Sequence, residues 1–229
     1  TEAIRHLFSV TAGLDSAVIG EHEILGQVRT AWERSAEHGI VGSTLGPLFR
    51  HAVETGKRAR TDTAIGRGIA SVSQAAVALA TEQLGGLDGR TVLVLGAGEM
   101  AEGTVKSLAA AGTSDIFVAN RTWDNAVALA EACGGTAVNL DAVGDALVAV
   151  DMLVTTTGAQ QLILESGEIA GFLSRRNGRE LVIVDVAVPR DVDPRAGELP
   201  GVTLLDMDDI GVFVEQQMAT RTRVVGNVE

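Results

Sequence analysis

The sequence predicts an α/β protein, in which a doubly wound parallel sheet domain follows a helical region. Three observations support this prediction. From residue 91 onward, short runs rich in valine and isoleucine alternate with helical stretches. The 27 glycines and only 4 prolines suit many tight connections between strands and helices. Before residue 85, the apolar residues instead recur at the spacing of helices.

The first 85 residues are expected to form three helices. Apolar residues at spacings of three and four predict a helix from Ile24 to about His38, which Gly39 can end. The same pattern predicts a second helix from Thr44 to about Arg60. A third, rich in alanine and capped by Ser71 or Ser73, runs to about Leu84.

Strands alternate with helices after a boundary that we place at Gly85–Gly89. Continuous apolar strands of this kind indicate a parallel sheet that is covered on both faces. The expected strands are Thr91–Leu95, Asp115–Ala119, Thr136–Val138, Met152–Thr156, Leu181–Val184 and Val202–Leu205. The expected helices between them are Ala101–Ala111, Trp123–Cys133, Leu140–Val148 and Ile169–Arg176. A last helix should begin near Asp208 or Asp209, either of which can cap it.

Charge and composition exclude several classes of protein. The net charge is −12, and residues 1–70 are neutral, so the rest of the chain carries the whole excess. An acidic surface disfavours non-specific binding of nucleic acid. The basic residues Lys57, Arg58, Arg60 and Arg67 indicate either a solvated helix face or a contact for a polyanion. One cysteine excludes an internal disulfide, and no apolar run approaches the roughly 20 residues of a membrane span, so we expect a cytoplasmic protein.

The turn after the first predicted strand has the pattern of a dinucleotide-binding loop. Its residues are Gly96, Ala97, Gly98, Glu99, Met100 and Ala101. The first glycine permits the tight turn, the second lets a pyrophosphate approach the backbone, and a small third residue lets the helix pack on the strand. Helix N–H groups favour the anion. We therefore expect a Rossmann-type domain that binds a nucleotide, and we assign no residue to a metal.

The end of the second predicted strand distinguishes the cofactors. An NAD site usually has an acidic residue here, but the sequence has Asn120, Arg121 and Thr122. A guanidinium suits the 2′-phosphate of NADP, although Arg121 could also be an ordinary surface arginine. Two further segments, Thr155–Gly158 and Asp185–Asp191, either line the nicotinamide side of the crevice or form a hydroxyl-rich turn and a salt-bridged loop.

Polar residues are dense between residues 6 and 27. Ser16, Glu21, Glu23 and Gln27 have the groups needed to bind an amino-acid head group. Helix capping and surface carboxylates would give the same pattern. The residues alone leave both interpretations open.

Five segments together resemble glutamyl-tRNA reductase, and in that family's order. They are the run from His6 to Val28, Lys57–Gly66, the glycine-rich loop, Ala119–Thr122 and Asp185–Asp191. The resemblance implies reduction of glutamyl-tRNA by NADPH to glutamate-1-semialdehyde, the entry to C5 tetrapyrrole (porphyrin) synthesis, through a cysteine thioester. It also implies a homodimer for the intact enzyme.

The resemblance also implies roles for residues of the first run. His6 matches a histidine important for activity, and Ser16, Glu21, His22, Glu23 and Gln27 match substrate-contacting positions. Residues 96–101 match the dinucleotide loop. The implied arrangement is a helical part of the catalytic and substrate domain at 1–85, an NADPH-binding domain at 86–206, and the start of a helix connecting to a dimerisation domain at 207–229.

One feature departs from the family pattern. The family's nucleophilic cysteine lies in a Cys-Asn-Arg segment upstream of the first run, and this chain has only Cys133. We expect Cys133 to be a buried core residue and the chain to be an inactive internal fragment. Two alternatives are a shikimate-dehydrogenase-like oxidoreductase, which needs a lysine–aspartate pair, and a noncatalytic NADP-binding regulator.

Overall fold

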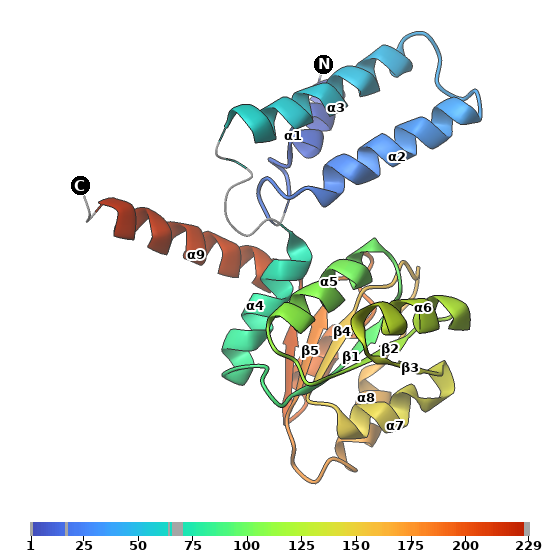
Figure 1. The fold of residues 1–229 in the computed structure, drawn as a ribbon, viewed down its shortest axis with the longest axis vertical. Helices are drawn as coiled ribbons and strands as arrows, with labels where there is room; N and C mark the ends of the chain where they lie inside the picture. The colour runs from blue at the N-terminus through green and yellow to red at the C-terminus, as the bar shows by residue number, and fades with distance from the viewer. Residues whose placement is uncertain (1, 17, 64, 66–70, 227–229) are drawn as a thin grey trace. The chain divides into compact units, whose positions relative to one another are not determined.

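The computed structural model describes residues 2–16, 18–63, 65 and 71–226 (Figure 1). The chain forms two compact units. One contains residues 1–72 and 211–229, and the other contains residues 73–210. Arg67, one of the basic residues noted in the sequence, lies outside the described residues.

The helical unit contains α1 (Glu2–Ala12), α2 (Glu23–Glu37) and α3 (Leu45–Asp62), which contact one another. α2 and α3 match the helices expected from Ile24 to about His38 and from Thr44 to about Arg60 closely. The sequence analysis did not predict α1, whose residues are mostly exposed or half-buried. At Gly56 a Cβ atom would lie 2.5 Å from the carbonyl oxygen of Thr11, so glycine is required where α3 crosses α1.

Arg60 ties the three helices of this unit together. Its guanidinium donates to the carbonyl oxygens of Thr11 at 3.0 Å, Gly56 at 2.9 Å and Glu21 at 3.1 Å through Nε. Burial lowers the pKa of Arg60 and the nearby Glu21 carboxylate raises it, with burial the larger effect. This member of the basic cluster is therefore a structural residue.

Replacing Arg60 with methionine should destabilise the protein by about 2 kcal/mol, because three carbonyl groups lose a charged donor. Arg58, on the same helix, provides a matched control because its side chain is exposed and its contact with Asp62 is 3.6 Å long. Arg58→Met should change the unfolding free energy by less than about 0.5 kcal/mol. Urea denaturation measures both, and equal losses would contradict the structural role of Arg60.

The second unit contains one sheet of six parallel strands, which confirms the predicted fold class. The strands are β1 (Thr91–Leu95), β2 (Asp115–Ala119), β3 (Thr136–Val138), β4 (Met152–Thr155), β5 (Leu181–Asp185) and β6 (Val202–Leu205). Their order across the sheet is β3-β2-β1-β4-β5-β6. Leu95 is in register with Ala119 on one side and with Thr155 on the other. The strand order therefore reverses direction at β1, between β1 and β4.

Helices cover both faces of the sheet, as the apolar strands predicted (Figure 1). They are α4 (Val72–Leu84), α5 (Glu99–Ala110), α6 (Trp123–Cys133), α7 (Val143–Ala149) and α8 (Ser166–Leu173), with short 3-10 turns at Leu140–Ala142 and Pro194–Glu198. The sheet unit begins at Ser73, before the boundary that the sequence suggested, because the buried alanines of α4 belong to its core. Within the described residues, no helix is long and apolar enough to cross a membrane.

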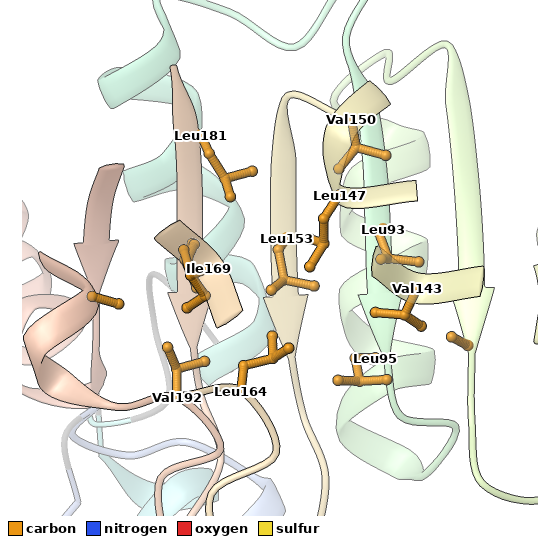
Figure 2. Close-up of a cluster of buried hydrophobic side chains, with 13 residues drawn as sticks. Leu93, Leu95, Val143, Leu147, Val150, Leu153, Leu164, Ile169, Leu181 and Val192 are labelled. Carbon is orange, nitrogen blue, oxygen red and sulfur yellow. The ribbon is translucent and has the colours of Figure 1, made fainter. Parts of the chain in front are cut away.

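Alternate strand residues build the two halves of the core. Leu93, Leu153 and Ile183 are in register and belong to one buried cluster with Leu147 of α7 and Ile169 of α8. Figure 2 shows Leu93 and Leu153 beside these two helix residues. The valines at the intervening positions of the same strands are also buried, and they point to the opposite face. Burial on both faces leaves the carboxyl ends of the strands as the place for a ligand.

The last helix, α9 (Met207–Gly226), has a different cap from the one expected. Asp206, rather than Asp208 or Asp209, accepts hydrogen bonds from the backbone N–H groups of Asp208 at 2.8 Å and Asp209 at 3.2 Å. The Asp209 carboxylate in turn accepts the N–H of Asp206 at 2.9 Å. The two acids thus form a reciprocal cap, in which Asp209 takes the place usually held by glutamate.

Candidate functional site

A pocket of about 480 Å³ lies at the carboxyl ends of β1, β2 and β4. This is where strand order reverses, the usual ligand position in an open parallel sheet. The pocket is mostly apolar, and Arg121 is the one charged side chain among the described residues that line it. The lining residues are Leu95, Gly96, Ala97, Gly98, Asn120, Arg121, Leu140, Thr156, Thr157, Gly158, Ala159 and Ile163.

Gly96 makes the tight turn that opens the pocket. Its φ is +125°, and a Cβ atom would lie 2.2 Å from Oγ1 of Thr156. Its N–H donates to the carbonyl oxygen of Ala119 at 2.8 Å, and the N–H of Thr156 donates to the carbonyl of Leu95 at 2.9 Å. Only glycine fits this conformation between two loops, as the fingerprint implied.

Replacing Gly96 with alanine should destabilise the chain by about 2 kcal/mol, through the strained backbone and the collision with Thr156. Gly98→Ala is the matched control. Gly98 has an extended backbone that alanine can adopt, and its Cβ atom would have no neighbour within 4 Å. Thermal unfolding should therefore separate the two variants. Equal melting temperatures would contradict the role given to Gly96.

The loop leads into α5 with its backbone exposed toward the pocket. Gly98 precedes the helix, and within the described residues no side chain caps this end. Ala101 is fully buried, as the third fingerprint position requires. Glu99 and Met100 do not line the pocket. Met100 instead accepts a hydrogen bond from the Ser73 hydroxyl, whose Oγ lies 3.2 Å from both the sulfur and the carbonyl oxygen of Met100.

The loop after β2 places Asn120 and Arg121 on the pocket wall. Asn120 donates through Nδ2 to the carbonyl oxygen of Thr122 at 3.0 Å, which fixes the turn between them. In the described structure Arg121 is exposed and has no ion-pair or hydrogen-bond partner. Thr122 precedes α6 and does not line the pocket. Arg121 is thus available for an anionic ligand.

The other side of the pocket is formed by the loop after β4. Thr156, Thr157 and Gly158 line it, as expected for the first of the two loops noted in the sequence. The second loop, Asp185–Asp191, does not line the pocket but supports it. The Asp191 carboxylate accepts the N–H of Thr157 at 2.9 Å and its hydroxyl at 2.6 Å.

Asp185 and Asp191 are both buried. Asp185 accepts the Thr155 hydroxyl at 2.9 Å and the N–H groups of Asp191 and Val192, each at 3.0 Å. Burial raises the pKa of Asp191, the two hydrogen bonds from Thr157 lower it, and the Asp185 charge raises it, for a net upward shift. Arg190 forms ion pairs outside the pocket, with Asp206 at 2.8 Å and Asp208 at 3.7 Å.

The residues of the helical unit that were predicted to bind substrate or to act in catalysis differ in their exposure and in their contacts. Glu21 is buried, and its carboxylate accepts the N–H groups of Glu23 at 2.6 Å and Ile24 at 2.9 Å, so it caps α2. His6 is exposed, and its Nδ1 lies 3.3 Å from Oδ2 of Asp15. Ser16 and Glu23 are half-buried, whereas His22 and Gln27 are exposed.

No described group of three or more His, Cys, Asp or Glu side chains could hold a metal ion.

Comparisons with known proteins cover both units. Residues 1–63 match the family model described as Glutamyl-tRNAGlu reductase, N-terminal domain, and residues 78–212 match the model described as Shikimate / quinate 5-dehydrogenase. A glutamyl-tRNA reductase from Pelotomaculum thermopropionicum is 44% identical over 228 residues, which is 100% of this chain and 51% of that protein. A second, from Heliobacterium mobile, is 41% identical over 100% of this chain and 52% of its own length.

The chain is homologous to glutamyl-tRNA reductases over its whole length. A solved glutamyl-tRNA reductase from Methanopyrus kandleri is 40% identical, with a TM-score of 0.65, and the match covers 99% of this chain and 57% of that one. The nucleotide-binding domain of the Thermoplasma volcanium glutamyl-tRNA reductase, 18% identical with a TM-score of 0.50, matches 66% of this chain and 96% of its own and supports the fold alone. The chain spans about half the length of its curated relatives.

The sheet domain of this chain belongs to the shikimate/quinate 5-dehydrogenase family, which is also the family of the alternative interpretation. The match over residues 1–63 and the relatives that span the whole chain favour the glutamyl-tRNA reductases. The lysine needed for the alternative is not in the pocket. Lys106 lies on α5, 3.9 Å from Glu102, and Lys57 lies on α3 of the other unit.

The position of Cys133 differs from the expectation. It is half-buried rather than buried. It is the last residue of α6, and the two residues that follow, Gly134 and Gly135, have no side chains to cover it. Its Sγ donates to the carbonyl oxygen of Ala130 at 3.3 Å, as part of the wall of a groove between α5 and α6. This groove shares Ala97 with the pocket at the carboxyl ends of the strands, but Thr156–Ala159 line only that pocket.

Proposed function

We propose that this protein is an NADPH-dependent glutamyl-tRNA reductase, which reduces the glutamyl group of glutamyl-tRNA to glutamate-1-semialdehyde at the start of C5 tetrapyrrole synthesis. The observation that carries the proposal is the pocket between the ends of β1 and β4, where the strand order reverses, in a chain similar to glutamyl-tRNA reductases over its whole length. Among the described residues that line this pocket, the unpaired Arg121 is the one charged residue. We also propose that the protein is cytoplasmic, that the intact enzyme is a homodimer and that glutamyl-tRNA is its substrate.

The residues of the pocket fit three parts of NADPH, namely its pyrophosphate, its 2′-phosphate and its nicotinamide. The backbone of Gly96–Gly98 and the start of α5 can donate to the pyrophosphate. Arg121 can form a charge-assisted bond with the 2′-phosphate, and the missing acid after β2 removes the usual partner of an unmodified ribose. The nicotinamide then lies toward Thr156–Gly158, because β4 is on the other side of β1 from β2. NADPH supplies the hydride for the reduction.

The substrate side is proposed to lie in the helical unit. His6, whose Nδ1 lies beside the Asp15 carboxylate, can protonate a leaving group or orient a carbonyl. Ser16, His22, Glu23 and Gln27 provide the polar groups for the glutamyl moiety. Glu21 supports them by capping α2, which carries Glu23 and Gln27.

The nucleophile of the implied thioester is not assigned to Cys133. Its thiol faces a carbonyl oxygen within α6, and Lys106 is the one cation among the described residues that line the same groove. We expect no glutamyl adduct on Cys133 after incubation with glutamyl-tRNA. Mass spectrometry that trapped such an adduct would contradict this assignment.

A coupled assay tests the proposed function. In a protein of the relatives' full length that carries this sequence, NADPH oxidation should depend on glutamyl-tRNA and give glutamate-1-semialdehyde. Oxidation that depends on dehydroshikimate instead would support the shikimate-dehydrogenase-like alternative. Tight NADPH binding with no turnover on either substrate would support the noncatalytic regulator.

A further inference from the structure

Two buried carboxylates lie directly behind the wall of the pocket. Asp185 is 2% exposed and Asp191 is 0% exposed. Among the described residues, neither has a basic side chain within ion-pair distance, although a buried charge without a counter-ion is costly. All their recorded partners are N–H and hydroxyl groups of the two loops. Such an arrangement fixes the positions of those loops.

Asp185 sets the position of Asp191. It receives the N–H groups of Asp191 and Val192 on Oδ2, at 3.0 Å each. On Oδ1 it receives the Thr155 hydroxyl at 2.9 Å and the N–H of Ala187 at 3.1 Å. These four bonds fold the loop after β5 back beneath the end of β4, so that the Asp191 carboxylate faces Thr157.

Asp191 sets the direction of the Thr157 hydroxyl. A carboxylate only accepts, so the hydroxyl must donate its proton to Oδ1, and the 2.6 Å distance is typical of a hydrogen bond from a hydroxyl to a carboxylate. Oγ1 also accepts the N–H of Ala159 at 3.2 Å. One lone pair of this oxygen remains, and Thr157 lines the pocket. The hydroxyl therefore acts toward a ligand as a hydrogen-bond acceptor.

The place of Thr157 in the pocket identifies the part of the ligand it faces. Arg121 follows β2 and Thr157 follows β4, with β1 and its glycine loop between them. With the 2′-phosphate at Arg121, the nicotinamide end reaches Thr157. Its carboxamide has an N–H group that needs an acceptor.

We propose that Asp191 is a positioning residue that holds the Thr157 hydroxyl as the acceptor for the carboxamide N–H of the nicotinamide. This inference rests on the proposed binding of NADPH. It assigns the Asp185–Asp191 segment to selection of the cofactor's reactive end, whereas Arg121 selects its phosphate end.

Titration with two probes tests this inference. The probes are NADPH and 2′-phospho-ADP-ribose, which has every part of NADPH except the nicotinamide. Thr157→Val and Asp191→Asn should weaken NADPH binding by about 3- to 10-fold, the loss of one hydrogen bond, and leave 2′-phospho-ADP-ribose binding unchanged. Thr157→Ser keeps the hydroxyl and should bind both probes like the unmutated chain.

Asp193→Asn is the matched control, since Asp193 is a buried carboxylate of the same loop whose partners are Arg195 and the N–H of Ser166. It should leave both affinities unchanged. Unchanged NADPH binding in Thr157→Val, or equal weakening of both probes, would overturn the inference while the proposed function stands. If the unmutated chain bound neither probe, the proposed function itself would fall. If Asp191→Asn does not fold, the two Thr157 variants decide the question.

Discussion

Replacing Arg121 with alanine should lower the affinity for NADPH about 10- to 150-fold while NADH binding stays nearly the same. A charge-assisted bond to the 2′-phosphate contributes about 1.5–3 kcal/mol, and NADH has no such phosphate. Arg121 is exposed and unpaired among the described residues, so its loss should not disturb the fold. Isothermal titration of the variant with both nucleotides measures the effect.

Arg175→Ala is the control for a general change in surface charge. Arg175 lies on the same unit and is paired with Asp145 at 2.7 Å. This variant should keep the preference of the unmutated chain for NADPH. If Arg121→Ala also kept it, the 2′-phosphate would have another partner and the assignment of Arg121 would be wrong.

Replacing His6 with asparagine should lower turnover on the order of 100-fold in a protein of the relatives' full length that carries this sequence. The imidazole is exposed, and its contact is the Asp15 carboxylate at 3.3 Å. A side chain so exposed contributes little to the core, so the melting temperature should change little. Stopped assays of glutamate-1-semialdehyde formation measure the turnover, and calorimetry measures the melting temperature.

Two further variants separate catalysis from packing. His38→Asn, at an exposed histidine that ends α2, should leave turnover unchanged. Asp15→Asn should lower turnover less than His6→Asn does, because Asp15 acts through the imidazole. Near-normal turnover with a melting temperature several degrees lower in His6→Asn would make His6 a structural residue.

The strands and the nucleotide loop could be predicted because their signals are local. Continuous apolar runs mark the strands, and the positive φ of Gly96 and the burial of Ala101 account for two fingerprint positions. By contrast, α1 was missed since most of its residues are exposed or half-buried, which weakens its apolar pattern. The Asp206–Asp209 cap was missed although its i, i+3 spacing of acids was visible in the sequence.

The supports of the site could not be predicted because their partners are backbone groups far away in the chain. Arg60 donates to carbonyl oxygens, which carry no mark in the sequence. Asp191 reaches Thr157 only because β4 and β5 are neighbours in the sheet. Glu21 was predicted to contact substrate, yet both its carboxylate oxygens cap α2. A sequence pattern shows which polar residues are present, and tertiary structure decides which groups they bind.

Calorimetric titration of the unmutated 229-residue chain with NADPH and with NADH tests the central claim most directly. We expect both nucleotides to bind at one site, with NADPH at least about tenfold tighter because Arg121 has no other partner among the described residues. Equal affinities for the two nucleotides, or no binding of NADPH, would contradict the assignment of this pocket.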